Sequence, residues 1–218
     1  MILPALARCG GERVLMKVWC SNRLLSDVQT VASLRYSTSK IGSSSFEVLG
    51  IEPDAYSQVS PLDFVSGSTE EAFSQLNTGR NTILNSLAAS TLKLNVGDEL
   101  TMDTPNGAQT YHIVGIANDV LSFKLNAMFI SQANLKTDFN KVEDVMLMLI
   151  LNSSADKAVV KSNVERVMAD YPQFTVRETG EYRKYILDYT VGAMNLFYVL
   201  YHPDPSGTRF AKHIDDQC

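Results

Sequence analysis

Cysteine, positive charge and long apolar runs are all scarce in this sequence of 218 residues. The three cysteines, Cys9, Cys20 and Cys218, lie within the first 20 residues or at the last position, which indicates neither a disulfide framework nor a cysteine nucleophile. With 19 Lys and Arg against 24 Asp and Glu, the net charge of −5 disfavours nucleic-acid binding, which needs a concentrated basic surface. No stretch reaches the roughly 18 to 20 apolar residues of a membrane span. We therefore expect the chain as given to be soluble.

The common catalytic and nucleotide-binding signatures are also missing. The sequence contains no Gly-x-Ser-x-Gly elbow, Walker A loop, His-Glu-x-x-His, Cys-x-x-Cys or Gly-x-Gly-x-x-Gly. Its acidic pairs, such as Glu70-Glu71 and Glu143-Asp144, are adjacent in sequence, whereas glycosidase carboxylates must face each other across a substrate. These pairs are therefore expected to be solvated charge. The sequence predicts no enzymatic activity, no catalytic residue and no cofactor.

The histidines do not show the spacing of a metal site. His112 falls in the middle of a predicted strand, between Tyr111 and Ile113, which favours a structural role. The C-terminal tail carries several groups that could bind a metal, namely His202, Asp204, His213, Asp215, Asp216 and Cys218. Their spacing forms no closed ligand shell, so we expect no functional metal site.

Patterns typical of strands and turns begin after a short N-terminal tail that shows no clear hydrophobic period. Residues 28–35 and 46–51 are predicted strands, separated by a serine-rich turn at 43–45, and should pair as a hairpin or lie close together. Between residues 61 and 139 the elements are shorter and are separated by glycines. Within that segment, Thr104-Pro105-Asn106-Gly107 is a strong hairpin motif because Asn-Gly readily adopts the positive φ of a tight turn. We interpret 61–139 as a smaller lobe.

The run 145–151 is apolar throughout and too short to span a bilayer, so it predicts a central strand covered on both faces. Alternation would place Leu147 and Leu149 on one face, and Met146 and Ile150 on the other. A helix should follow. Its expected capping box is Ser153 and Asp156, and its apolar stripe is Val160, Val164, Val167, Met168 and Tyr171.

A final helix, introduced by Gly180, is the most informative element. Apolar residues repeat along it at intervals of four and three, at Tyr182, Ile186, Tyr189, Ala193, Leu196 and Leu200. Its charges lie in its first half, at Glu181, Arg183, Lys184 and Asp188. Two interpretations remain open from this pattern. The helix is either the water-to-bilayer transition of a truncated membrane helix or a C-terminal core helix.

Four ordered segments carry a resemblance to a known family. They are Val-Leu-Gly-Ile-Glu-Pro-Asp-Ala-Tyr at 48–56, Ile-Leu-Asn-Ser-Leu-Ala at 83–88, Leu-Asn-Val-Gly-Asp at 94–98 and Tyr-His-Ile-Val-Gly-Ile at 111–116. In this order they resemble the extracytoplasmic (periplasmic) core domain of MacB/FtsX-type ABC transporter permeases. The likeness runs from about Val28 to Leu200, and the motifs are more specific together than singly.

The resemblance implies an α+β, two-lobed fold. A porter-like α/β lobe, formed by residues 23–60 and 140–201, would be interrupted by a smaller β-rich lobe at 61–139. The last part of the chain would be a stalk helix that enters a membrane helix. Residues 1–22 and 202–218 match nothing in the family and are tails of uncertain origin.

The resemblance also implies a function without catalysis. The chain would be an extracytoplasmic domain of a permease in the cell membrane, which contacts substrate or a partner protein through residues that the sequence does not identify. It would relay conformational change from a cytoplasmic ATPase through the membrane helices, in a permease that is itself a dimer. The alternative is an extracytoplasmic ligand-sensing domain of a membrane receptor. Family membership does not define what is transported.

Overall fold

The computed structural model describes residues 2–4, 27–118 and 126–201. The chain divides into two compact units, Met1–Arg177 and Glu178–Cys218. The first unit has a mixed α/β architecture, which confirms the predicted α+β class, and the second contains one long helix.

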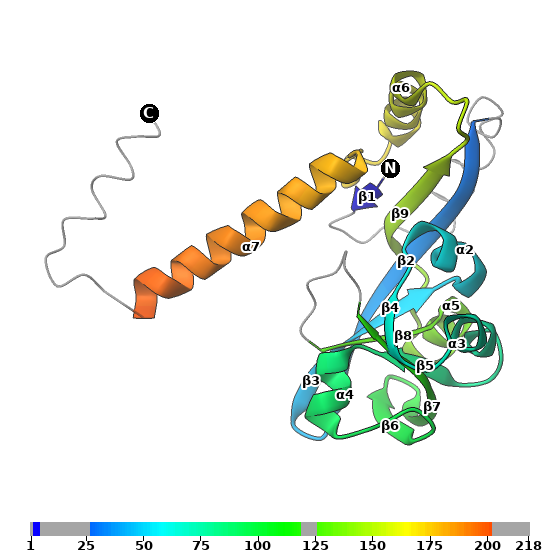
Figure 1. Cartoon of the computed structure of the whole chain (residues 1–218), viewed down its shortest axis with the longest axis vertical. Coiled ribbons are helices and arrows are strands. Elements are labelled where there is room, and N and C mark those ends of the chain that lie inside the picture. Colours follow the sequence, from blue (N-terminus) through cyan, green and yellow to red (C-terminus); the bar gives the residue numbers. More distant parts are fainter. Residues whose placement is uncertain (1, 5–26, 119–125, 202–218) are drawn as a thin grey trace, which may run out of the picture. The chain divides into compact units, whose positions relative to one another are not determined.

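One mixed sheet runs through the first unit (Figure 1). Its order is β1-β9-β2-β3-β8-β5-β7-β4, and β6 pairs with β7 beside this path. The strands are β1 (Ile2–Pro4), β2 (Val28–Ile41), β3 (Ser44–Ile51), β4 (Asp63–Ser66), β5 (Asn81–Leu84), β6 (Glu99–Thr104), β7 (Gly107–Asn118), β8 (Ala127–Ser131) and β9 (Asp144–Leu151). The predicted pairing of the first two strands is confirmed, because β2 and β3 are antiparallel neighbours. The predicted turn at Gly107 is also confirmed, with a φ of 94°.

The helices described in the first unit are α2 (Pro53–Val59), α3 (Thr69–Leu76), α4 (Ser86–Leu92), α5 (Gln132–Phe139) and α6 (Lys157–Met168). The second unit contains α7 (Thr179–Tyr201). The predicted capping box of α6 is wrong in detail. Asp156 itself is the N-cap and accepts hydrogen bonds from the backbone N–H groups of Ala158 and Val159, so its carboxylate satisfies the first turn without Ser153.

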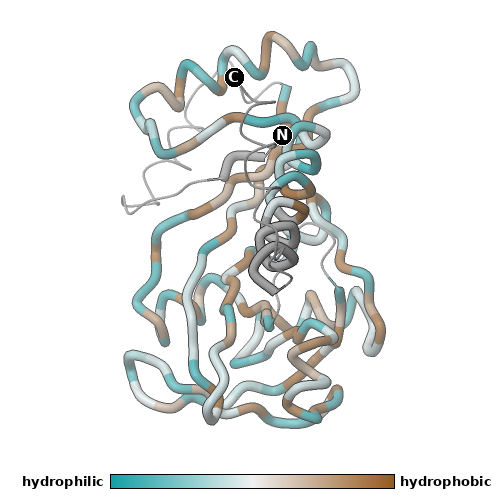
Figure 2. Tube along the Cα trace, turned by 90° about the vertical axis from the view of Figure 1, so that its left-hand side faces the viewer, coloured by the Kyte–Doolittle hydropathy of each residue, from teal (hydrophilic) through white to brown (hydrophobic). Residues whose placement is uncertain are grey.

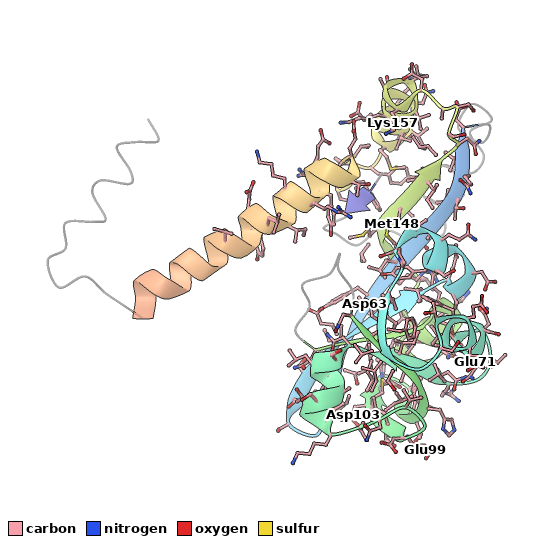
Figure 3. The ribbon with its side chains drawn as sticks, viewed as in Figure 1. Asp63, Glu71, Glu99, Asp103, Met148 and Lys157 are labelled. Atoms are coloured by element: carbon pink, nitrogen blue, oxygen red, sulfur yellow. The ribbon has the colours of Figure 1, made fainter. Side chains whose placement is uncertain are left out.

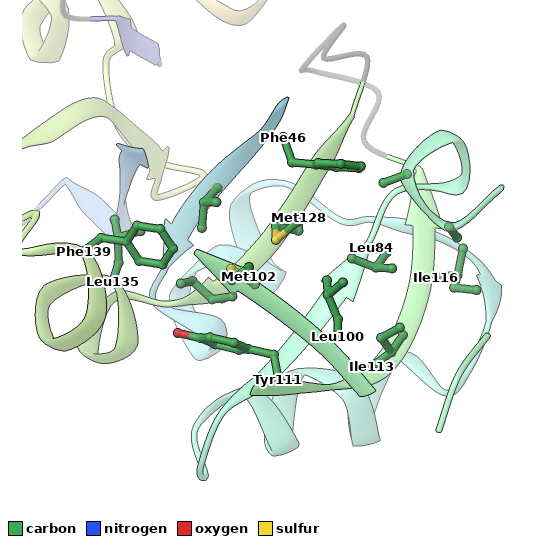
Figure 4. Close-up of a cluster of buried hydrophobic side chains, with 14 residues drawn as sticks. Phe46, Leu84, Leu100, Met102, Tyr111, Ile113, Ile116, Met128, Leu135 and Phe139 are labelled. Atoms are coloured by element: carbon green, nitrogen blue, oxygen red, sulfur yellow. The ribbon is translucent and has the colours of Figure 1, made fainter. Parts of the chain in front are cut away.

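Two apolar clusters make up much of the core. The larger one joins strands β3, β5, β6, β7 and β8 to α4 and α5, and it includes Phe46, Leu100, Met128 and Phe139 (Figure 4). Helix α5 lies close against β3 at Gly50, where an added Cβ would come within 2.6 Å of Leu135 Cδ2. Only glycine therefore allows this approach without a shift of the helix.

The smaller cluster packs α6 on β9. Leu147 and Leu149 are buried against Val160 and Val164, as the sequence predicted for this face of the strand. β9 lies between β1 and β2, so it is an interior strand, although it is next to the edge of the sheet. On the other face Met148 is buried, but Met146 and Ile150 are only half-buried, so the expectation of full burial for these two residues is wrong.

The predicted division into lobes at residues 61 and 139 stays a prediction. β3 belongs to one predicted lobe and β8 to the other, and they pair in parallel within the same sheet. Figure 2 shows apolar and polar residues alternating along the trace. Within the described part of the chain, none of the helices is both long and apolar enough to cross a membrane.

Candidate functional site

Among the residues that the structure describes, those considered for catalysis or metal binding do not converge. Glu70 and Glu71 are exposed in the first turn of α3, and the acidic side chains Asp63, Glu71, Glu99 and Asp103 come from three elements, β4, α3 and β6 (Figure 3). Within residues 2–4, 27–118 and 126–201, no group of three or more His, Cys, Asp or Glu side chains could hold a metal ion.

His112 lies on β7 with an exposed side chain, and its Nε2 is 3.4 Å from Glu99 Oε1 on β6. Both side chains are about 60% exposed, at 60% and 62%, so this pair is a surface contact across the hairpin and adds little stability. The predicted tail groups (His202, Asp204, His213, Asp215, Asp216 and Cys218) and the cysteines Cys9 and Cys20 lie outside the described residues.

The segment that leads to α7 is fixed in the smaller core cluster. Phe174 is 8% exposed and packs with Val164 and Met168, and Val176 packs at the margin of the same cluster. Two residues, 177 and 178, separate these apolar contacts from α7, which begins at Thr179.

Helix α7 forms most of the described part of the second unit. Leu187, Tyr189 and Val191 are 54%, 70% and 54% exposed, although all three are large and apolar. Their positions fall on different sides of the helix, since 187 and 189 are separated by about 200° at 3.6 residues per turn. Both interpretations of α7, as a truncated membrane helix and as a C-terminal core helix, therefore stay predictions, since the helix belongs to a separate compact unit.

A buried ion pair joins β2 to β9. Arg35 Nε donates to Asp144 Oδ1 at 3.0 Å, and the two side chains are 11% and 0% exposed. The expectation of solvated charge is thus wrong for Asp144. A register shift between Leu34 and Arg35 explains its orientation, because Leu34 pairs with Met146 and Arg35 with Asp144. The bulge places Asp144 on the face of Arg35, where regular alternation would have turned it away.

Further polar contacts surround this pair. Gln132, at the start of α5, donates from Nε2 to the Ser33 carbonyl at 3.0 Å and to Ser33 Oγ at 2.7 Å. Glu52 precedes α2, and burial raises the pKa of its carboxyl, as does the nearby charge of Asp144, while Arg35 lowers it. On the α2 side, Thr30 Oγ1 donates to Gln58 Oε1 at 2.8 Å.

A second polar cluster fixes α5 to β5 and β7. Arg80 donates from Nε and Nη2 to the two oxygens of Asp138, at 2.9 Å each, and the Tyr111 hydroxyl donates to Asp138 Oδ2 at 2.6 Å. Burial of Asp138 opposes its ionisation, but the hydrogen bonds from Arg80 and Tyr111 outweigh burial and lower the pKa of its carboxyl. Burial raises the pKa of the Tyr111 phenol, and the hydrogen bond to Asp138 adds to this effect.

Sequence reasoning missed the polar residues of both clusters. The only sequence pattern that could have revealed the first is the polar alternation of Ser33, Arg35, Ser37 and Ser39 along β2. A strand with one face in water shows the same alternation, so the sequence did not distinguish a buried polar face from a solvated one.

Comparisons with known proteins show which family and which solved structures this chain resembles. The sequence matches the family described as MacB-like periplasmic core domain over residues 14–167. The structure is similar to the extracellular domain of the ABC-type transporter YknZ from Gram-positive bacteria, with 16% identity, a TM-score of 0.57, and coverage of 82% of this chain and 99% of that one. It is also similar to the periplasmic region of MacB from Actinobacillus actinomycetemcomitans, with 11% identity, a TM-score of 0.57, and coverage of 85% and 91%. At 16% and 11% sequence identity, these two similarities show a shared fold alone. No curated protein matches the chain in sequence.

Proposed function

The chain belongs to the MacB-like periplasmic core domain family, as its sequence motifs indicated, and on that premise we propose that it relays ATPase-driven movement in an ABC transporter permease. It would work on the extracytoplasmic side of the cell membrane as part of a dimeric permease. There it would contact the transported substrate or a partner protein. The ATPase would be a separate cytoplasmic domain or subunit, connected through the membrane helices.

The observation that carries this proposal is the anchored start of α7. Phe174 and Val176 pack into the α6 and β9 cluster immediately before the helix, which continues over 23 residues from Thr179 to Tyr201. A stiff helix attached to a packed core passes displacement into that core, since packed interiors have low compressibility. Exposed apolar residues along α7 fit a stalk that continues toward a bilayer or a neighbouring helix.

The chain itself should have no enzymatic activity under this proposal. ATP hydrolysis would be confined to the partner, because the sequence has no phosphate-cradling loop. Purified chain should therefore show no ATP turnover above buffer. Turnover that persists through purification and is abolished by one substitution in this chain would contradict a purely mechanical role.

Spin-label distances in the full-length permease with its ATPase would test the relay. One label pair joins Asp188→Cys on α7 to Glu70→Cys on α3, and both native side chains are exposed. The control pair is Glu70→Cys with Glu99→Cys, within the first unit. We expect the first distance to differ between nucleotide-free and ATP-trapped states and the control distance to remain constant.

The same measurement distinguishes the alternative function. A ligand-sensing receptor domain would change the α7 distance when a ligand is added and would not respond to nucleotide. An α7 distance that is identical in the nucleotide-free and ATP-trapped permease would refute the relay, because a relay must change conformation with the state of its motor.

A further inference from the structure

Strand β2 connects the end of the sheet that contains β1 and β9 to the remaining strands. Its residues 28–35 pair with β9, and its residues 34–41 pair with β3. Leu34 and Arg35 are the residues of β2 with registered partners on both sides. The sheet therefore narrows at these two residues, which we call the waist. Figure 1 shows β2 running between the part with β9 and α6 and the part with β3 and β8.

The two apolar clusters lie on either side of the waist, and the buried residues Ala32 and Leu34 of β2, which belong to neither cluster, lie at the waist or next to it. The cluster of α6 and β9 contains residues from 28–31 and 147–176, whereas the cluster around α4 and α5 contains residues from 41–139. Among the described residues, no buried residue belongs to both clusters. The chain crosses from one side to the other at the waist and again at residues 140–143, between α5 and β9.

Specific polar contacts bridge the waist. Gln132 bonds to Ser33 on one face, where Arg35 also pairs with Asp144, and Thr30 bonds to Gln58 on the other. Helix α2 also contacts both β2 and β9. Hydrogen bonds of this kind can be replaced by bonds to water at a small net cost, unlike buried apolar contacts, which lose their packing when they separate. The bulge at Arg35 adds a local irregularity in the ladder.

We propose that the first unit consists of two bodies that hinge at this waist. The smaller body is β9 with α6 and the first half of β2, and the larger body is the rest of the sheet with α2, α3, α4 and α5. The hydrogen bonds of Thr30 and Gln132 hold the hinge in the observed position. This goes beyond the proposed relay, because it concerns movement inside the first unit and holds whether or not α7 is a stalk.

The hinge can be tested in the 218-residue chain without nucleotide, ATPase or membrane, after Cys9, Cys20 and Cys218 are replaced by serine. Labels at Glu165→Cys on α6 and Glu70→Cys on α3 report distance across the waist. Labels at Thr38→Cys on β2 and Glu70→Cys form the control pair. The control pair lies within the larger body, yet it crosses the lobe boundary that the sequence predicts at residue 61.

The perturbation is the double variant Thr30→Val with Gln132→Met, which removes two bridges and keeps side chains of similar size. Each lost hydrogen bond should raise the open population about fivefold to tenfold, so the distribution across the waist should widen or gain a second distance. Thr101→Val is the matched control. It removes the 2.9 Å contact between Thr101 and Thr110, which lies inside the larger body, and should leave both distributions unchanged.

Three outcomes would overturn the hinge. The first is a narrow distribution across the waist that is the same in the double variant and in the parent chain. The second is widening of the Thr38 and Glu70 pair, which would place the moving boundary between β3 and β8. The third is equal widening of both pairs, which would show general loosening. If Gln132→Met prevents folding, Thr30→Val alone still tests the proposal, because Thr30 is only half-buried and its bond to Gln58 lies at the surface.

Discussion

Replacing Leu147 by alanine tests whether the layer of α6 on β9 stabilises the domain. Leu147 is 0% exposed and lies in the cluster with Val160, Val164 and Phe174. The substitution removes three carbon atoms from the side chain and cannot add a polar group. Its effect therefore measures apolar packing at this position.

The expected magnitude follows from burial. Three buried methyl or methylene groups at about 0.8 kcal/mol each amount to about 2.4 kcal/mol of lost transfer free energy. The cavity left beneath α6 adds to this, because surrounding side chains relax only partly, and Leu→Ala changes in cores cost roughly 2 to 5 kcal/mol. We expect Leu147→Ala to lower the free energy of unfolding by about 3 to 4 kcal/mol.

Urea denaturation followed by circular dichroism would measure this difference. Leu187→Ala on α7 is the matched control, since Leu187 is 54% exposed and should change stability by less than about 0.5 kcal/mol. Ile150→Ala should fall between the two, because Ile150 is half-buried on the other face of β9. A loss at Leu147 no larger than the loss at Leu187 would show that α6 does not pack on β9 as described.

Two further predictions concern ionisable groups. Tyr111→Phe should cost about 1.5 to 3 kcal/mol at pH 7 by removing a hydrogen bond to the ionised Asp138. The lowered pKa of Asp138 gives stability above the ordinary aspartate pKa of about 3.9, and this stability is lost as pH falls through the folded-state pKa. The cost should therefore shrink at pH 3, and an equal cost in denaturation at both pH values would contradict it. The raised pKa of Glu52 has the opposite sign, because ionisation above that pKa penalises the folded state. Glu52→Gln should raise the melting temperature at pH 7 relative to Glu70→Gln, with the gain disappearing below about pH 4.3, and a gain that persists in acid would refute this.

The sequence predicted the order and type of the elements well where local chemistry determines them. The Asn-Gly turn, the apolar run of β9 and the amphipathic stripe of α6 each depend on residues close together in the chain. Their positions agree with the structure to within a few residues. The family likeness depended on four other local segments, at 48–56, 83–88, 94–98 and 111–116, and the family match confirms it.

The buried polar face of β2 could not be predicted in this way. Ser33, Ser37 and Ser39 are 0%, 7% and 4% exposed, although their alternation with Ala32 and Leu34 is typical of a strand with one face in water. Elements distant in sequence cover this face. Gln132 of α5 reaches Ser33, and Ser39 Oγ donates to the Asp103 carbonyl of β6 at 2.7 Å. Such coverage depends on tertiary packing, which secondary-structure propensity and hydrophobic periodicity do not predict.

Asp144 shows how one irregular residue pair in a sheet can change the environment of a side chain. As part of Glu143-Asp144 it resembled ordinary surface charge, and it would have pointed away from Arg35 in a regular strand. The bulge places Asp144 on the same face as Arg35. Because both side chains are buried there, removal of either one would leave the other as an unpaired buried charge. No sequence pattern in β9 marks the bulge, since Val145 is simply the first residue of an unbroken apolar run.

The distribution of apolar and polar contacts gives the proposed relay a direction. Phe174 and Val176 attach the segment before α7 to the smaller body through apolar packing, which resists separation. The contacts of Ser33 and Thr30 across the waist are hydrogen bonds, each of which costs less to exchange for water. A displacement that enters through α7 should therefore move α6 and β9 together and be released at the waist.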